Sequence, residues 1–271
     1  MSALWAPWGG AALFLVLTMA AAWVAQHRTG QGGWADAFWS FGMGIAGAGA
    51  ALVPLHAQAA PTPRQVLVAA LIGLWGLRLG VHIARRAGRE GEDGRYASLR
   101  AQWGAAFEPR MFGFLMLQAA AGALLLLSVL LAARNPLPGF RALDVAAALL
   151  ALASIAGEGL ADRQLKAFKA DPANRGRVCD RGLWAWSRHP NYFFEWLGWC
   201  VWPVFAIDLS GGWPWGWLAL TAPAYMYWLL TRVSGIPPLE AHMRRTRPEA
   251  FEDYASRTNA FFPGPPRRRA G

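Results

Sequence analysis

Long apolar segments alternate with short polar ones along the whole chain. Segments with enough consecutive apolar residues to cross roughly 30 Å of hydrocarbon lie near residues 8–26, 34–55, 65–85, 111–132, 142–162, 190–207 and 214–232. The remaining stretches are too short for a separate soluble domain. The pattern predicts an all-α integral membrane protein, with residues 1–271 forming a single domain that is a bundle of seven transmembrane helices. Residues 263–271 are expected to be a disordered tail.

Composition and charge support this interpretation. The chain is 55% hydrophobic, holds 16 tryptophans, and has 26 basic against 16 acidic residues, a net charge of +10. Most of the basic residues lie in three segments, 85–110, 163–189 and 232 onward. By the positive-inside rule, the N-terminus is outside and the C-terminus is cytoplasmic. Because these charges lie in loops between spans, we expect no nucleic-acid binding, which needs a basic face on a soluble module.

The two cysteines, Cys179 and Cys200, stand alone. The sequence has neither a CxxC spacing nor a histidine cluster, so it predicts no disulfide framework and no metal site.

Several polar residues interrupt the predicted spans, where a charged group costs roughly 2.5–3.5 kcal/mol on insertion scales. Three pairs have the i,i+4 spacing that puts both members on one helix face. The interrupting residues are Asp36, Arg78 with His82, Glu158 with Asp162, and Asn191 with Glu195. One interpretation is that they form ion pairs between helices, with Arg78 facing Glu158 or Glu195. The other is that they line one polar cavity open to the cytosol.

A large anionic ligand would explain such a cavity. Arginine forks bind phosphates bidentately and lysine acts as a point charge. The candidate basic cradle consists of Arg85, Arg86, Arg95, Lys166, Lys169 and Arg177. Neither GxGxxG nor GxxxxGK[ST] occurs, so a nucleotide would be bound by the helices and loops of the membrane fold.

Several motifs resemble those of a known family. The segments "GEGLADRQLKAFK", "SRHPNYFFEWLGW" and "FEDYASRTNAFFP" resemble the membrane steroid 5-alpha-reductase family, including its bacterial homologues. "WADAFW" and "WGLRLGVHIARRAGREGEDGRYASLR", with Asp93, Arg95 and Tyr96, resemble the bacterial branch. The isoprenylcysteine carboxyl methyltransferases share an RHP-x-Y motif, so the resemblance extends to a superfamily.

The resemblance implies a seven-helix bundle that binds NADPH and reduces the carbon–carbon double bond of an enone such as a 3-oxo-4-ene steroid. The positions that it implies for cofactor binding are Arg86, Arg95, Tyr96, Glu158, Asp162, Lys166, Lys169, Arg177, Asn191, Glu195 and His242. Asn191 and Glu195 match the pair at the nicotinamide end, whereas Glu158 departs from the asparagine of the animal enzymes. The cofactor site would face the cytoplasm, in a bacterial inner membrane.

The catalytic pair of the animal enzymes is an acidic residue early in the second span and a tyrosine late in the third. Neither has an identical match, and the nearest positions are Asp36 and His82, which we predict to be catalytic. A hydrophobic small-molecule substrate would enter from the bilayer, with Trp34 and Trp39 among its contacts. Membrane lipids are the other expected partners, and no obligate protein partner is inferred.

Two other functions are open. An S-adenosylmethionine-dependent methyltransferase acting on a lipid-like substrate would need fewer phosphate-binding cations than this chain offers. A transporter or sensor of hydrophobic molecules would have broken helices in corresponding halves of the chain, a symmetry that the sequence lacks.

Overall fold

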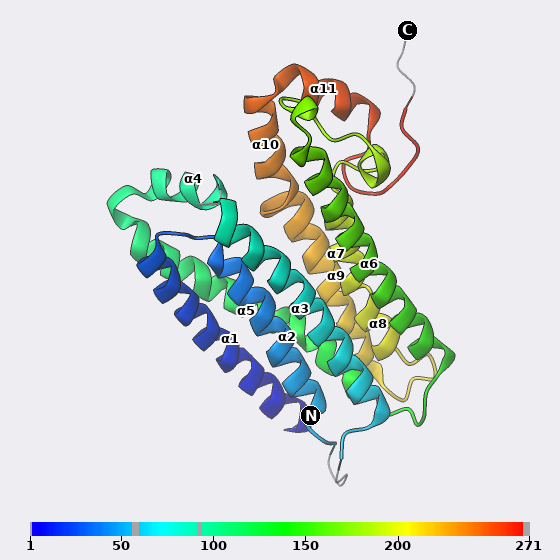
Figure 1. The fold of residues 1–271 in the computed structure, drawn as a ribbon. Helices are drawn as coiled ribbons and strands as arrows, with labels where there is room; N and C mark the ends of the chain where they lie inside the picture. Colours follow the sequence, from blue (N-terminus) through cyan, green and yellow to red (C-terminus); the bar gives the residue numbers. More distant parts are fainter. Residues whose placement is uncertain (1, 56–59, 91–93, 268–271) are drawn as a thin grey trace. The chain divides into compact units, whose positions relative to one another are not determined.

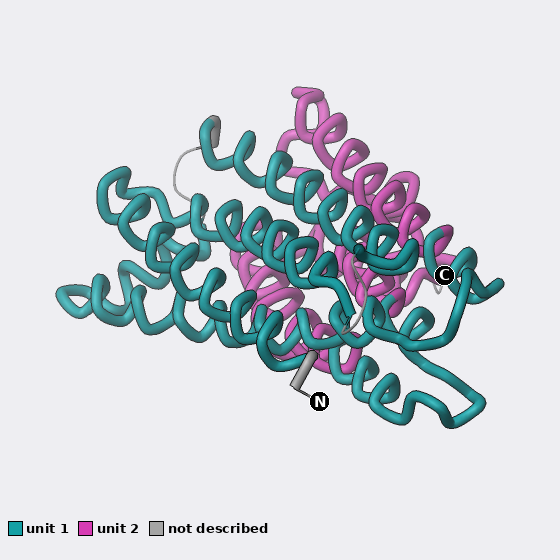
Figure 2. The backbone as a smooth tube through the Cα atoms, turned by 90° about the horizontal axis from the view of Figure 1, so that it is seen from below, with its two compact units in different colours: residues 1–148, 202–222 teal, residues 149–201, 223–271 magenta. Residues whose placement is uncertain are grey.

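The computed structural model describes residues 2–55, 60–90 and 94–267. Every regular element within these ranges is helical, which confirms the all-α class for the described residues. The chain divides into two compact units, coloured in Figure 2: unit 1 holds residues 1–148 and 202–222, and unit 2 holds residues 149–201 and 223–271. The single-domain organisation stays a prediction. Asp93 and the end of the predicted tail, residues 268–271, lie outside the described residues.

Unit 1 is built on long helices that lie side by side (Figure 1). Its elements are α1 (Ser2–Thr29), α2 (Trp34–Leu52), α3 (Pro63–Glu90), α4 (Gly94–Trp103), η1 (Gly104–Ala106), α5 (Phe107–Ala133), the first turns of α6 (Ala142–Ala170), α8 (Val201–Ala206) and η4 (Pro214–Leu220).

Small residues let α2 and α3 approach closely. A Cβ added at Gly76 would lie 2.7 Å from the Cα of Gly44 and 2.8 Å from the carbonyl oxygen of Ser40. Close contact through glycines is a common way for helices to associate in lipid, where burial of apolar surface gives little driving force. The glycines of α2 therefore hold it against α3, and Asp36, near the start of α2, is held with it.

A buried ion-pair network joins the start of α3 to the loop before α6. Arg64 of α3 donates to the Asp144 carboxylate at 2.9 Å and to the carbonyl oxygens of Asn135, Leu137 and Gly139. Arg141 donates to the same carboxylate at 2.8 Å. The donors and acceptors of this network satisfy one another, so we infer that it stabilises the conformation of the 135–141 loop.

Unit 2 contains shorter elements. After the remainder of α6 they are η2 (Pro172–Asn174), η3 (Gly182–Ala185), α7 (Pro190–Trp199), α9 (Thr221–Trp228), the π-helical turn η5 (Leu229–Val233), α10 (Ile236–Thr246) and α11 (Pro248–Arg257).

Four of the described helical segments are long and apolar enough to cross a membrane: Leu4–Thr29, Pro63–Gly88, Gly94–Ala133 and Ala142–Ala170. Many of their large apolar side chains are exposed, such as Leu13, Leu117 and Leu149, as lipid-facing residues would be. Both findings are consistent with an integral membrane protein.

The other predicted spans have less regular helices. The segment 190–207 is divided into α7 and α8, and 214–232 runs through 3₁₀, α and π geometry. Proline residues explain part of this, because Pro203, Pro214 and Pro223 each lack a backbone donor. The segment 34–55, by contrast, contains one regular helix, α2, which ends at Leu52. The count of seven spans and the orientation of the termini stay predictions.

Candidate functional site

Three residues singled out from the sequence meet in unit 1. The Tyr96 hydroxyl donates to Oδ1 of Asp36 at 2.9 Å, and the Arg95 guanidinium donates to Oδ2 of the same carboxylate. The Arg95 guanidinium also lies over the Tyr96 ring, 4.7 Å from its centroid. A carboxylate that begins α2 is thus held by two consecutive residues of α4, and we call Asp36, Arg95 and Tyr96 the Asp36 cluster.

The position of the Tyr96 ring depends on a glycine before α2. The ring is fully buried, and a Cβ added at Gly32 would lie 2.3 Å from its Cγ. Only a residue without a side chain leaves room for the ring at this point. The "GG" that precedes "WADAFW" therefore has a specific packing role beside the Asp36 cluster.

An amide of α5 extends this polar cluster. The Gln118 side chain lies beside the Tyr96 hydroxyl, while the backbone oxygen of Gln118 accepts from Nε1 of Trp39 at 3.3 Å. Trp39 also meets Trp75 edge to face, with ring centroids 6.1 Å apart. Sequence reasoning missed Gln118, although a lone amide in the apolar run "FGFLMLQAAAG" was a usable signal.

The other predicted site residues of unit 1 are more exposed than Tyr96. His82 is half-buried on α3, and Arg86 is exposed one turn further along the same helix. Trp34 is half-buried at the first position of α2. The structure brings Asp36, Arg95, Tyr96 and Trp39 together around Gln118.

In unit 2, α6 and α7 pack through facing stripes of residues. A Cβ on Gly157 of α6 would meet the Phe194 ring of α7 at 2.4 Å, and one on Gly198 of α7 would meet the Ser154 side chain at 3.8 Å. Residues spaced by three and four positions share a helix face. Glu158 lies on the contacting stripe of α6, between Ser154 and Ala161, and is buried.

The matching stripe of α7 carries the amide and the acid. Asn191, Phe194, Glu195 and Gly198 have the spacing of one face, so Asn191 and Glu195 lie on the side that meets α6. Glu195 is buried, and its Oε1 accepts from Nε1 of Trp199 at 2.8 Å. The predicted i,i+4 pairs of α6 and α7 therefore occupy the faces that bring these two helices together.

The other residues of unit 2 that are predicted to bind the cofactor lie at or near its surface. Lys166 and Lys169 are exposed on the last turns of α6, where Asp162 is half-buried. Arg177 is exposed in the following loop, and His242 is exposed on α10. Lys166, Lys169 and Arg177 are therefore accessible to an anionic ligand.

A second carboxylate cluster in unit 2 was not anticipated. Glu240 of α10 accepts from Nε of Arg188 at 2.8 Å, from Nε2 of His189 at 3.1 Å and from Arg244 at 3.4 Å. Arg188 also donates to the carbonyl oxygens of Ala255 and Thr258. We call Arg188, His189 and Glu240 the Glu240 cluster; it ties the segment before α7 to the C-terminal helices.

The pKa values of Glu240 and His189, the two titratable groups of this cluster, are both lowered. Burial would raise the pKa of Glu240, but the hydrogen bonds from His189 and Arg188 outweigh it and lower the pKa to about 2. Burial lowers the pKa of His189, against the opposing effect of Glu240. The carboxylate is ionised and the imidazole is neutral at pH 7.

The described residues contain no group of three or more His, Cys, Asp or Glu side chains that could hold a metal ion. The two cysteines are free thiols, and burial raises the pKa of Cys179.

The described residues form an all-helical protein with four helices long and apolar enough to cross a membrane, which is consistent with the class of integral membrane proteins. The model of the family described as "Protein of unknown function (DUF1295)" matches residues 22–258, and the chain belongs to this family. The family comprises membrane proteins that are similar to steroid 5-alpha-reductases. No curated protein and no solved structure gives a significant match.

Proposed function

We propose that this protein is an NADPH-dependent oxidoreductase that reduces the carbon–carbon double bond of an enone lipid. The observation that carries the proposal is the hydrogen bond from the Tyr96 hydroxyl to the Asp36 carboxylate. It pairs an acidic residue early in the second helix with a tyrosine that follows the third, which is similar to the catalytic pair of the animal enzymes, although their tyrosine lies late in the third span and Tyr96 was predicted from the resemblance as a cofactor-binding residue. On this basis Tyr96 replaces His82 as our first candidate for the proton donor.

The pair suits the charge that develops during the reaction. Addition of a hydride to the β-carbon of an enone puts negative charge on the carbonyl oxygen, and a proton then completes the reduction at the α-carbon. A donor directed at that oxygen lowers the barrier. The Tyr96 hydroxyl would donate to it, Asp36 would orient the hydroxyl, and Arg95 would balance the carboxylate charge.

The residues of unit 2 fit the cofactor chemically. Asn191 offers an amide and Glu195 a buried carboxylate on one face of α7, a set that complements the neutral carboxamide of nicotinamide. The exposed cations fit its phosphates. When bound, NADPH supplies the hydride. The residues of unit 2 that would hold it are Glu158, Asp162, Lys166, Lys169, Arg177, Asn191, Glu195 and His242.

The substrate would be hydrophobic and would enter from the bilayer, with a 3-oxo-4-ene steroid as the first compound to test. Trp34 and Trp39 would contact its apolar body, since Trp39 adjoins the Asp36 cluster through Gln118. We propose seven membrane crossings with the N-terminus outside, in a bacterial inner membrane. The cofactor site would then face the cytoplasm, on the side of the basic segments.

A ligand-stabilisation experiment separates this proposal from the methyltransferase alternative. The purified protein in neutral detergent is heated with NADPH, with NADH or with S-adenosylmethionine. We expect NADPH to raise the melting temperature, because a ligand that binds only the folded state stabilises it. Stabilisation by S-adenosylmethionine and none by NADPH would reject the proposal. A panel of enones, scored by NADPH oxidation, then identifies the substrate.

A further inference from the structure

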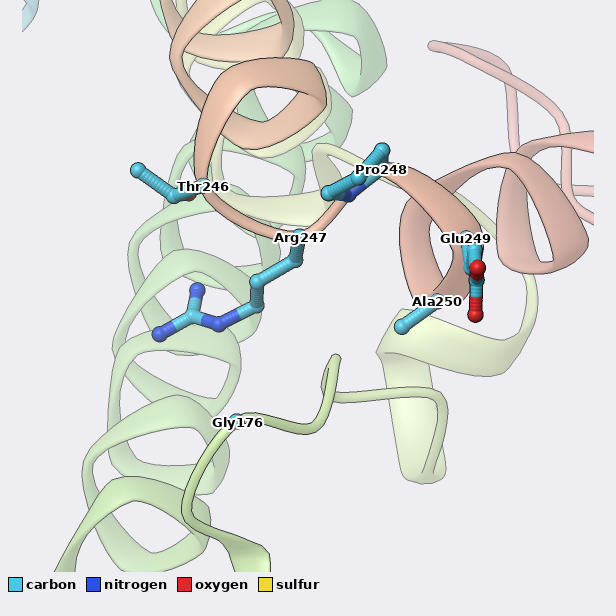
Figure 3. A pocket seen from close by; sticks show the side chains of 6 residues that line it. All are labelled: Gly176, Thr246, Arg247, Pro248, Glu249 and Ala250. Carbon is cyan, nitrogen blue, oxygen red and sulfur yellow. The ribbon is translucent and has the colours of Figure 1, made fainter.

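Unit 2 has a surface cavity of about 480 Å³, with Gly176 on one side and residues 246–250 on the other (Figure 3). The Arg247 side chain extends from the turn before α11 toward the Gly176 loop, as Figure 3 shows. Because Gly176 adjoins Arg177, which is among the proposed contacts of the cofactor, this cavity belongs with the proposed cofactor site. A buried cation of unit 1, by contrast, has no part in the proposed function.

This cation is Arg134, which caps the C-terminus of α5 and is 5% exposed. Its Nη2 donates to the carbonyl oxygen of Val53 at a long 3.3 Å, and its Nε is buried without an acceptor among the described residues. Burial lowers the pKa of Arg134, and no neighbouring charge opposes this effect. A buried charge without a partner is costly, so Arg134 calls for a ligand that the chain itself does not supply.

The nearest carboxylate is taken by two other arginines. Arg64 donates to Oδ2 of Asp144 at 2.9 Å, and Arg141 donates to Oδ1 of the same carboxylate at 2.8 Å. Arg64 also donates to the carbonyl oxygen of Asn135, the residue after Arg134, so this ion-pair network lies beside the end of α5. The network pairs two arginines with one acid and leaves the third arginine without a counter-ion within the described part of the chain.

The other acceptors at this end of unit 1 are also occupied. The carbonyl oxygen of Val53 accepts from Nε2 of Gln65 at 2.7 Å, a shorter bond than the one from Arg134. The carboxylate of Asp208, in the loop after α8, accepts from the Ser210 hydroxyl on both of its oxygens. The C-terminus of α5 offers only a partial negative charge of about one half. Arg134 therefore keeps uncompensated positive charge.

A small anion is the ligand that fits this arrangement. A guanidinium group has five N–H donors and no acceptor, and the Arg134 side chain uses one of them within the described residues. An anion accepts hydrogen bonds from such donors and also supplies the missing charge. Because the side chain is nearly enclosed, a monatomic ion such as chloride suits the site better than a bulky phosphate ester.

We propose that the Arg134 guanidinium binds a chloride ion at the C-terminal end of α5. The ion would compensate the charge that Arg64, Arg141 and Asp144 leave unpaired, and it would stabilise the contact between the ends of α5 and α2 that Arg134 makes through Val53. The site uses none of the residues that the reductase proposal assigns, so either proposal can fail without the other.

Thermal unfolding of the full-length protein in neutral detergent tests the site. Potassium chloride is replaced stepwise by potassium gluconate at constant ionic strength, which keeps general screening unchanged. Wild type should melt on the order of 3 °C higher in chloride, with a saturable dose dependence, because a ligand that binds only the folded state stabilises it. Bromide should replace chloride. A melting temperature that does not change with the chloride concentration would overturn the proposal.

Two variants separate a specific site from general surface charge. Arg134→Met removes the guanidinium and should abolish the shift between gluconate and chloride. Arg232→Met is the matched control, because it removes the same charge from an exposed arginine, and it should keep the shift of wild type. An equal shift in Arg134→Met and wild type would overturn the site, and so would an equal loss of the shift in both variants.

A direct binding measurement keeps the test decisive if Arg134→Met does not fold. Exchange of chloride with a protein site broadens the ³⁵Cl NMR line, and wild type should broaden it in a way that added bromide reverses. Arg134→Lys keeps the charge but loses the guanidinium fork, and it should need roughly tenfold more chloride for the same stabilisation. Absence of bromide-sensitive broadening with folded wild type would reject the chloride site.

Discussion

The Asp36 cluster and the Glu240 cluster are built alike. In each, one carboxylate accepts hydrogen bonds from an arginine and from the ring-bearing residue that follows it in the chain, Arg95–Tyr96 in unit 1 and Arg188–His189 in unit 2. The chemistry of the donors therefore does not separate the two clusters.

The two clusters differ in how far their side chains are exposed. The side chains of Glu240, Arg188 and His189 are 8%, 12% and 4% exposed, and both Glu240 oxygens accept hydrogen bonds. In the Asp36 cluster the Tyr96 ring is fully buried, but the side chains of Asp36 and Arg95 are 19% and 35% exposed. A closed carboxylate cluster stabilises the fold, whereas an open one can also meet a ligand. The comparison therefore favours a structural role for the Glu240 cluster and supports the proposed chemical role of the Asp36 cluster.

The largest expected effect is on catalysis. Tyr96→Phe removes one hydroxyl from the Asp36 cluster, and it should lower kcat for enone reduction by about 10²- to 10³-fold, the usual loss for a donor to a developing oxyanion. NADPH affinity should stay unchanged, since the cofactor carboxamide is expected to meet α7. Steady-state kinetics with His82→Phe as the parallel variant checks this, and loss of turnover in His82→Phe alone would make His82 the proton donor.

Substitutions in the Glu240 cluster should lower the stability of the protein. Arg188→Met breaks a buried ion pair and leaves Glu240 enclosed, so it should lower the free energy of unfolding by about 3 kcal/mol. Arg244→Met removes a contact to the same carboxylate from a side chain that is 51% exposed, and should cost less than about 1 kcal/mol. Thermal unfolding in detergent compares the two, and equal losses would remove the distinction between closed and open contacts.

A packing variant tests the position of Tyr96. Gly32→Ala places a methyl group against the Tyr96 ring and should reduce kcat about tenfold by moving the hydroxyl away from Asp36. Gly49→Ala, which lies within α2 and has open space around its added Cβ, is the control. It should keep full activity, and a loss in Gly49→Ala equal to that in Gly32→Ala would contradict the packing argument.

The smallest effect is on the acid dependence of stability. The folded-state pKa values of His189 and Glu240 are both lowered, so the unfolded chain binds more protons and the stability falls as the pH is lowered. The contribution of His189 to the free energy of unfolding should begin to decline below about pH 6.5. The contribution of Glu240 should decline between about pH 4.3, its ordinary pKa, and its folded-state pKa of about 2. Glu240→Gln should flatten the lower part of a melting-temperature profile. An unchanged profile would show that the cluster does not titrate as described.

Several parts of this description could be read from the sequence. The helical class follows from the length of the apolar runs, and Asp36, Arg95 and Tyr96 each stood out as polar residues in or beside them. Their contact could not be read, because it joins positions 60 residues apart in the chain and depends on where α4 folds back. The sequence therefore favoured His82, in the third span itself, over Tyr96.

The Glu240 cluster shows a different limit. Arg188 and His189 attracted attention as part of "SRHPNYFFEW", but Glu240 lies in a polar amphipathic helix whose acidic residues are expected to face solvent. In the folded protein Glu240 is buried because it packs against Arg188 and His189. The irregular geometry of 190–207 and 214–232, by contrast, had a signal in Pro203, Pro214 and Pro223.

The most direct test of the proposed function follows the transferred atoms. The protein is incubated with a 3-oxo-4-ene steroid and NADPH that carries deuterium at the reactive C4 position, in ordinary water, and the product is examined by mass spectrometry and NMR. We predict a saturated ketone with one deuterium on the former β-carbon, and a second label on the α-carbon only when the solvent is D₂O. No enone in a broad panel being reduced, together with methyl transfer from S-adenosylmethionine, would contradict the account.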